Sequence, residues 1–214
     1  MEGDCGLTLG TPHARGGVLR IRMKYLTLVR HAKSSWAQAG LSDHDRPLNE
    51  RGLRAAPAVA SFLHRTYFGG GDTPALIPPP DRLVTSTAAR ALGTAKIMLE
   101  VSRMPVESVL LDSRLYLAEA PQILEVVRQF DENWKHAVLF GHNPGLHDFA
   151  ERVLARAHVA KMPTCTAVLL ALPHAYWGLA DWAEAQLIGY VTPKALERRF
   201  PELYAGISRS DGED

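Results

Sequence analysis

Short apolar runs alternate along the chain with longer segments in which apolar residues recur at helical spacing. The runs are short enough for buried strands and lie at residues 25–29, 83–85, 106–111, 137–140, 166–172 and 186–191. The helical segments run from a cap at Asn49 to about Phe68, from Ser86 or Thr87 to about Ser102, from Ala118 to Phe130, and from Leu146 to Ala157. We therefore predict an α/β fold, a three-layer α/β/α sandwich with a largely parallel central sheet and an antiparallel edge.

Both ends of the chain lack this alternation. Residues 1–22 show no sustained periodicity before Val18 and are predicted to form a flexible leader. The polar residues 206–214 are predicted to be a disordered tail. Residues 23–205 between them have the length and apolar content of a single domain.

Composition excludes several classes of partner. The formal net charge of +1 over 214 residues gives no global attraction to nucleic acid or to an anionic membrane, so any anion site must be local. Cys5 and Cys165 form no C-x-x-C pair, and we expect two free thiols in a reducing cytoplasm. No apolar run has the length of a membrane span, and no export signal is apparent. The sequence leaves the oligomeric state open.

Three of the predicted strands lead directly into cationic or histidine residues. Arg30 and His31 follow the first strand, Arg90 lies in the first turn of the helix after residues 83–85, and His142 follows residues 137–140. The carboxyl ends of parallel strands open onto one crevice, and helix N-termini add partial positive charge there. Because the planar guanidinium fork matches two oxygens of a phosphoryl group, the sequence predicts a pocket for a phosphate dianion.

Histidine in such a pocket can form a covalent intermediate. A neutral imidazole attacks phosphorus through one ring nitrogen while the other, hydrogen-bonded to the backbone, supports the cation that forms. Neighbouring arginines disfavour the protonated ring and keep the nucleophile available near neutral pH. We assign the attack to His31, beside Arg30, and a stabilising donor role to His142; removing one such donor typically costs ~3 kcal/mol.

Four motifs in order resemble the histidine phosphatase superfamily, and within it the SixA-type phosphohistidine phosphatases look closest. The motifs are V-R-H-A-K-S at 29–34, D-R-P-L-N-E-R-G at 45–52, T-S-T-A-A-R at 85–90 and F-G-H-N-P-G at 140–145. The resemblance runs from about Lys24 to Pro201 and implies a phosphoglycerate mutase-like fold. It implies that His31 accepts the phosphoryl group, that Arg30 and Arg90 clamp its oxygens and that His142 completes the pocket. Arg46 matches a further phosphate-contacting arginine of SixA-type members.

The resemblance leaves the general acid open. Glu119 is the best candidate, because larger superfamily members supply an acid from the corresponding region, and Asp43 and Asp45 remain possible. An alkyl phosphate needs such an acid to protonate its leaving oxygen, whereas phosphohistidine can leave as a neutral imidazole. Ala32 departs from the family, where many members carry glycine, and its methyl group is expected to narrow the pocket or alter the loop.

We therefore expect a metal-independent phosphatase without a cofactor, acting on phosphohistidine, preferably on a protein, or on related phosphomonoesters. The arginines would supply the charge neutralisation that magnesium provides elsewhere. A small-molecule phosphomonoesterase or mutase and a non-catalytic phosphate-binding module on the same fold are the alternatives. A metal site on the Asp43-His44-Asp45 segment ranks lowest, because adjacent loop residues seldom converge on one ion, and a solvated turn is expected there.

Overall fold

The computed structural model describes residues 23–38, 40–72 and 74–205. The strands of these residues form one six-stranded sheet in the order β3-β2-β4-β1-β5-β6. In chain order they are β1 (Lys24–Arg30), β2 (Arg82–Thr85), β3 (Val109–Leu111), β4 (His136–Gly141), β5 (Ala167–Leu172) and β6 (Gln186–Val191). The predicted leader at 1–22 and tail at 206–214 lie outside the described residues.

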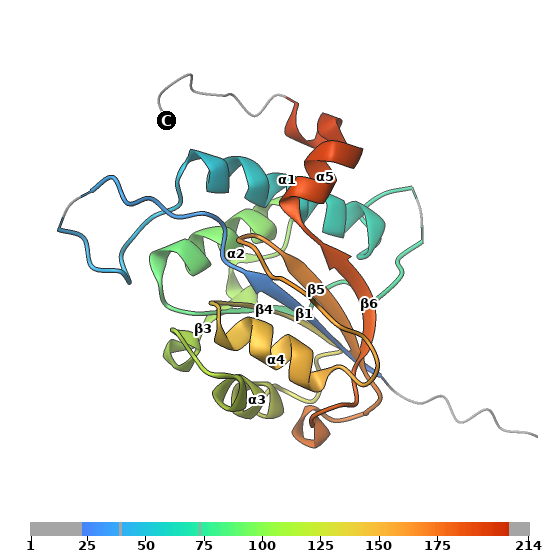
Figure 1. The fold of residues 1–214 in the computed structure, drawn as a ribbon. Helices are drawn as coiled ribbons and strands as arrows, with labels where there is room; N and C mark the ends of the chain where they lie inside the picture. Colours follow the sequence, from blue (N-terminus) through green and yellow to red (C-terminus); the bar gives the residue numbers. More distant parts are fainter. Residues whose placement is uncertain (1–22, 39, 73, 206–214) are drawn as a thin grey trace, which may run out of the picture.

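Strand β1 lies inside the sheet, between a parallel and an antiparallel neighbour (Figure 1). It pairs in parallel with β4, where Arg30 is opposite Gly141, and antiparallel with β5, where Val29 is opposite Ala167. Strands β2 and β3 extend the parallel half, and β6 adds an antiparallel edge to β5. The prediction of a largely parallel sheet with an antiparallel edge is confirmed.

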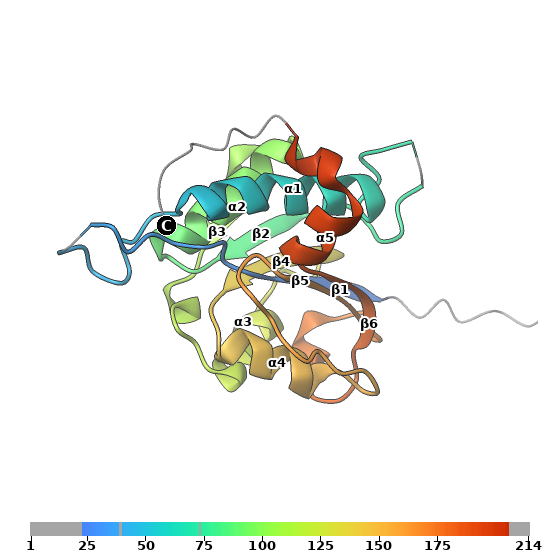
Figure 2. The same cartoon turned by 45° about the horizontal axis from the view of Figure 1, so that its top comes forward.

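Helices cover both faces of the sheet. They are α1 (Glu50–Thr66), α2 (Ala89–Val101), α3 (Ala120–Arg128), α4 (Gly145–Val153) and α5 (Pro193–Arg199). Figure 2 shows α1, α2 and α5 on one face and α3 and α4 on the other. Adjacent residues of β4 point to opposite faces, so Leu139 belongs to the apolar core under α3 and α4 while Phe140 belongs to the core under α1 and α2. The three-layer prediction is confirmed.

Helix α1 begins where the sequence predicts. The Asn49 side chain accepts a hydrogen bond of 3.0 Å from the backbone N–H of Gly52, which satisfies a donor that the first helical turn leaves free. The helix continues through Pro57 and ends at Thr66, two residues before the predicted end at Phe68. Among the described residues, no helix combines the length and the apolar character that crossing a membrane requires.

Other element boundaries differ from the prediction. Neither Ser86 nor Thr87 is the N-cap of α2, because Ala88 occupies that position and the Ser86 hydroxyl is engaged elsewhere. Helix α4 ends at Val153 rather than Ala157, because Leu154 pairs with Ala185 in an isolated parallel bridge. Strand β3 is shorter than predicted, because residues 106–108 form a 3₁₀ turn, and α5 was not predicted at all.

The two tryptophans near the chain end belong to the core under α3 and α4. Trp177 is completely buried, and its indole N–H donates a hydrogen bond of 3.0 Å to the carbonyl of Trp134. Trp182 is partly buried against the same core, with its ring 5.9 Å from that of Phe149. Cys165 is a buried free thiol, as predicted, whereas Cys5 lies outside the described residues.

Candidate active site

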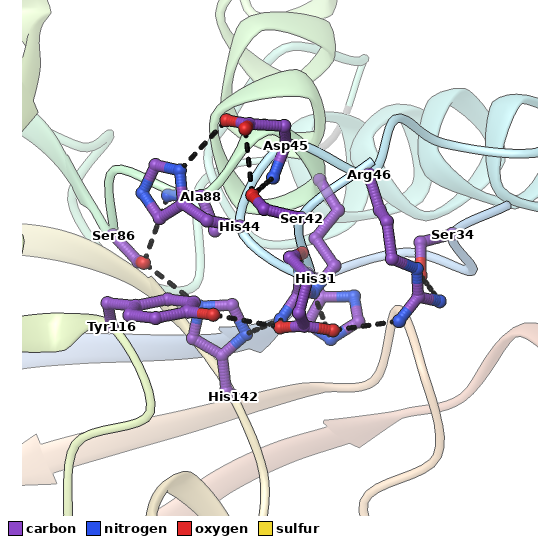
Figure 3. A network of polar contacts seen from close by, with 12 residues as sticks. His31, Ser34, Ser42, His44, Asp45, Arg46, Ser86, Ala88, Tyr116 and His142 are labelled. Atoms are coloured by element: carbon purple, nitrogen blue, oxygen red, sulfur yellow. Dashed lines mark hydrogen bonds and ion pairs between the residues drawn. The ribbon is translucent and has the colours of Figure 1, made fainter. Parts of the chain in front are cut away.

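The ends of β1, β2 and β4 bring the predicted histidines and Arg90 together. The N–H of His31 donates to the carbonyl of Gly141 at 3.1 Å, and the N–H of Ser86 donates to the carbonyl of Phe140 at 3.1 Å, so the three ends are joined by backbone bonds. The ring centroids of His31 and His142 are 5.1 Å apart. Figure 3 shows both rings in one polar network with Ser86 and Tyr116.

His31 presents one ring nitrogen to the site. Its Nδ1 lies 2.8 Å from the carbonyl oxygen of Ala32, which can only accept, so Nδ1 carries the proton. The other nitrogen, Nε2, therefore has a free electron pair in the neutral ring and accepts from Nε of Arg90 at 3.3 Å. Burial, with the charges of the nearby arginines, lowers the pKa of His31 to about 4 despite the opposing effect of the Ala32 carbonyl. His31 is consequently neutral at pH 7, in the form that a nucleophile needs.

His142 is held between a hydroxyl and a guanidinium. Its Nε2 lies 2.9 Å from Oγ of Ser86, and its Nδ1 lies 3.4 Å from Nη2 of Arg90. Burial, together with the proximity of His31 and Arg90, lowers the pKa of His142 to about 3. Because a guanidinium group can only donate, Nδ1 of His142 accepts from Arg90, and the proton of the neutral ring lies on Nε2, which donates to the Ser86 hydroxyl. His142 can donate into the site only if Arg90 leaves Nδ1 and the Ser86 hydroxyl reverses to become the donor, a role for Ser86 that the sequence did not suggest.

Asp43 lies at the centre of the arginine cluster. Its carboxylate accepts hydrogen bonds of 2.8 Å from Arg46, 2.8 Å from Arg90 and 2.9 Å from the hydroxyl of Tyr116. Partial burial alone would raise the pKa of Asp43, but the bonds from Tyr116 and Arg90 outweigh it and lower the pKa to about 2. Residues 43–45 form the expected solvent-exposed turn, but long-range contacts with Arg90 and Tyr116 also hold the Asp43 side chain in the site.

Arg46 is a buried member of the site, with only 8% of its surface exposed. Its guanidinium donates to Oγ of Ser34 at 2.7 Å and to the carbonyl of Ser35 at 2.9 Å. The indole ring of Trp36 stacks against it, with the guanidinium carbon 3.2 Å from the ring centroid. Figure 3 shows Arg46 directed toward the same network as His31. The contacts with Ser34, Ser35 and Trp36 tie Arg46 to the loop that follows His31.

A cavity of about 200 Å³ opens at His31. It is lined by Arg30, His31, Lys33, Ser34, Trp36, Arg46, Arg90 and Thr164. The volume lies below the range of roughly 300–1,000 Å³ usual for drug-sized ligands, and it suits a phosphoryl group better than a whole metabolite. Lys33, Trp36 and Thr164 were not singled out from the sequence, although Lys33 lies within the V-R-H-A-K-S motif.

Arg30 and Glu119 are placed differently from the other predicted residues. Arg30 lines the cavity, but one of its terminal nitrogens donates to the carbonyl of Met162 at 2.8 Å, and its buried Nε has no partner among the described residues. Glu119 is exposed at the N-cap of α3, outside the cavity lining. Its backbone lies against Gly145, the first residue of α4, so Glu119 is near the His142 loop without contacting the arginines.

Ala32 does not line the cavity. Its side chain is completely buried in the apolar core under α1, and its N–H donates to Oγ1 of Thr94 at 2.9 Å. The methyl group therefore fills core space and leaves the cavity unchanged, contrary to the expectation that it narrows the pocket. Within the described residues, no group of three or more histidine, cysteine or acidic side chains is placed to hold a metal ion.

Comparison with known proteins agrees with this geometry. The sequence model described as Histidine phosphatase superfamily (branch 1) matches residues 26–155. The chain belongs to the histidine phosphatase superfamily. An uncharacterized protein of Mycobacterium tuberculosis is 28% identical over 176 residues, covering 78% of this chain and 100% of that protein. An uncharacterized chloroplastic protein of Arabidopsis thaliana is 30% identical over 153 residues, covering 68% of this chain and 65% of that protein.

Solved structures of this superfamily share the fold. A structure from Agrobacterium tumefaciens assigned as phosphohistidine phosphatase SixA has a TM-score of 0.63 at 24% identity, covering 79% of this chain and 98% of that chain. The protein histidine phosphatase SixA in complex with tungstate has a TM-score of 0.63 at 16% identity, covering 80% of this chain and 99% of that chain. The α/β architecture is thus the phosphoglycerate mutase-like fold of the histidine phosphatases.

Proposed function

We propose that this histidine phosphatase hydrolyses phosphohistidine or related phosphomonoesters without a metal, through a covalent phosphohistidine intermediate on His31. One observation carries the proposal: a neutral imidazole with an unprotonated Nε2, in contact with Arg90, lines a small cavity together with the arginines Arg30, Arg46 and Arg90. The arginines would bind the phosphoryl oxygens, and Nε2 would be positioned for attack on phosphorus.

In the first step, Nε2 of His31 forms a bond to phosphorus while the bond from phosphorus to the leaving group breaks. The leaving group takes the electron pair, and the imidazole of His31 becomes a cation. The hydrogen bond from Nδ1 to the Ala32 carbonyl, 2.8 Å long, stabilises that cation. In the second step, the oxygen of a water molecule forms a bond to phosphorus while the bond from phosphorus to Nε2 breaks. Nε2 recovers the electron pair, the excess proton of the water stays on the phosphate product or passes to solvent, and His31 returns to its neutral form.

His142 would stabilise negative charge on the transferring oxygens. For this role its Nδ1 must carry the proton, which requires Arg90 to turn from Nδ1 to the phosphoryl group and the Ser86 hydroxyl to donate to Nε2 across their distance of 2.9 Å. A hydrogen bond from His142 to a phosphoryl oxygen would then strengthen as charge develops in the transition state. Ser86 is a positioning residue for this proton.

Two carboxylates remain candidates for the general acid. Asp43 lies among the arginines, and its pKa of about 2 keeps it ionised while the site is empty. A bound phosphoryl dianion would accept the hydrogen bonds that Arg46 and Arg90 donate to Asp43, and its negative charge would lie near the carboxylate. Loss of the arginine bonds and a nearby like charge each raise the pKa of a carboxyl group. Asp43 could thus become a proton donor only when substrate is bound. Glu119 would have to swing from the N-cap of α3 to reach the leaving group.

Phosphohistidine carried on a protein is the substrate that we favour. The likeness to SixA phosphatases supports it, and the small cavity accommodates a phosphoryl group while the rest of the substrate stays outside. Tungstate, bound in one SixA structure, has the tetrahedral oxygen arrangement of phosphate. The alternative of a small-molecule phosphomonoesterase rests on Asp43, because only an alkyl or sugar ester requires an acid within the site.

The test is a substrate panel of phosphohistidine, phosphoserine and sugar phosphates, with denaturing alkaline quench of the reaction. Wild-type protein should carry acid-labile phosphate, and His31→Ala should lose both this label and turnover. His158→Ala is the matched control, because the His158 side chain is 74% exposed and contacts only Glu151 among the ion pairs of the described residues. Normal turnover by His31→Ala would disprove the proposal.

A further inference from the structure

A second, larger cavity adjoins the catalytic one between α1, α5 and the loop before β5. Its volume is about 550 Å³. It is lined by Lys33, Arg51, Arg54, Ala55, Pro163, Thr164, Cys165, Pro193, Lys194, Glu197 and Tyr204. Lys33 and Thr164 also line the catalytic cavity, so the two cavities share a wall. The larger space therefore lies next to the position that we propose for the phosphoryl group.

The larger cavity is cationic. Four basic side chains, Lys33, Arg51, Arg54 and Lys194, line it against one acidic side chain, Glu197. Glu197 pairs with Arg54 at 3.5 Å, whereas Lys33, Arg51 and Lys194 form no ion pair with any other described residue. The buried Nε of Arg54 also has no hydrogen-bond partner among the described residues. Several cationic donors are thus available to an anion.

The walls of this cavity are held in place by the backbone that carries His31. The carbonyl of Lys33 accepts a hydrogen bond of 2.9 Å from the N–H of Asn49, at the start of α1. A side chain at Gly52 would collide with that carbonyl, so glycine permits the close approach of α1 to Lys33. On the opposite side, the N–H of Cys165 donates to the carbonyl of Arg30 at 3.0 Å. Backbone hydrogen bonds therefore tie both walls of the cavity to the segment that carries His31.

We propose that this cavity, which we call the cationic annex, binds a second anionic group on the same substrate molecule that delivers its phosphoryl group to His31. The inference rests on the proposed function and narrows the substrate class to compounds with a phosphate or carboxylate beyond the scissile bond. Two sources supply such a group, a second phosphate of a small molecule and an acidic side chain beside a phosphohistidine. Both sources present an oxyanion to the annex, and guanidinium and ammonium groups bind oxyanions through charged hydrogen bonds.

The experiment uses the full-length protein and the double variant Arg51→Gln/Lys194→Gln, which changes two annex residues outside the catalytic cavity. Arg199→Gln is the control, an exposed charge on α5 that does not line the annex. Two matched pairs of substrates are compared. One is a sugar bisphosphate and its monophosphate, and the other is a phosphohistidine peptide flanked by glutamate or by glutamine.

The double variant should raise KM for the doubly anionic member of at least one pair by about tenfold or more, because hydrogen bonds to charged groups are lost. KM for the singly anionic substrate of the same pair, and kcat for 4-nitrophenyl phosphate, should stay within about twofold of the wild-type values. The pair that responds identifies the source of the anion. The inference would be overturned if KM changed equally for the two substrates within each pair, or if KM changed for none of the four substrates.

Failure of the proposed function gives a different result. If none of these compounds is hydrolysed, the same variants are titrated by calorimetry with the sugar bisphosphate. Weaker binding to the double variant than to wild type and to Arg199→Gln supports the annex even then. Equal binding to all three overturns it, whatever the catalytic outcome.

Discussion

Replacing Asp43 with asparagine should make the empty site bind phosphate more tightly. In the free protein, the Asp43 carboxylate occupies donors of Arg46 and Arg90 at 2.8 Å each, which are the groups that a phosphoryl oxygen would use. A bound oxyanion must displace this carboxylate or share the arginines with it. Asparagine keeps the shape of the side chain and removes the charge.

The pKa of Asp43 sets the size of the effect. A decrease from the ordinary value of 3.8 to about 2 measures how strongly the site favours the ionised form. Because the side chain is 44% exposed, solvent screening reduces this preference to on the order of 1 kcal/mol. Losing that competitor should tighten the binding of inorganic phosphate about fivefold at pH 7.

The assay is competitive inhibition by inorganic phosphate, or calorimetric titration where turnover is low. Asp45→Asn is the matched control, because the Asp45 carboxylate bonds to Ser42 and His44 and touches neither arginine. If Asp43 is also the proton donor, Asp43→Asn should lower kcat for alkyl phosphates while leaving phosphohistidine turnover nearly unchanged. Unchanged or weaker phosphate binding by Asp43→Asn would refute the competition, and would mean that Asp43 mainly holds the arginines in position.

Four further outcomes are expected. Once kcat/KM is corrected for the ionisation of the substrate near pH 6, its acid limb should lie near pH 4, because His31 with its lowered pKa of about 4 stays neutral above that pH. A limb near pH 6.5 that remains after this correction would contradict the prediction. Burial lowers the pKa of His136 to about 4, below its unfolded value near 6.5, so its contribution to stability is complete above pH 6.5 and is lost toward pH 4. In urea titrations, His136→Gln should reduce the slope of unfolding free energy against pH in that window by about 1.4 kcal/mol per unit, and an unchanged slope would exclude the effect. Ala32→Gly should leave KM unchanged and lower the free energy of unfolding by about 1 kcal/mol, because the buried methyl group of Ala32 packs only in the core. A lower KM would show that this methyl group restricts the cavity. Trp36→Ala should raise KM severalfold with little change in kcat, because Arg46 loses its stacking partner. A decrease in kcat as large as the increase in KM would instead show that Trp36 contributes to the chemical step.

The sequence predicts the buried elements better than the exposed ones, for a physical reason. Runs such as 137–140 are apolar on both faces because β4 is covered by helices on both sides, and this leaves an unambiguous pattern. Helix α5 has seven residues with only Leu196 buried, so it carries no apolar stripe that periodicity can detect. Helix α4 ends early because Leu154 pairs with Ala185, a contact that no local pattern encodes.

The same distinction separates the site residues that the sequence places together from Tyr116, which it missed, and from Asp43, which it named only as a possible acid. Arg90 and His142 lie directly beyond buried strands, so the topology of a parallel sheet was enough to bring them to His31. Asp43 and Tyr116 reach the site from connections between elements, and their contact spans 73 positions of sequence. The only local signal for Asp43 was its position three residues before Arg46, the spacing at which the two side chains pair.

The charge balance of the site indicates which phosphoryl species fits it. At pH 7 both site imidazoles are neutral, because burial and the arginines lower the pKa of His31 to about 4 and that of His142 to about 3. Three guanidinium groups then face the single carboxylate of Asp43, which leaves two of their positive charges uncompensated, while the further charge of Lys33 in the cavity wall is exposed to solvent and screened. A phosphoryl dianion cancels the two guanidinium charges, whereas a monoanion leaves one of them without a partner, which is costly in a desolvated site. The dianion should therefore be the bound form, and phosphate affinity should fall as pH drops below the second pKa of the ligand, near 6, well before either histidine is protonated.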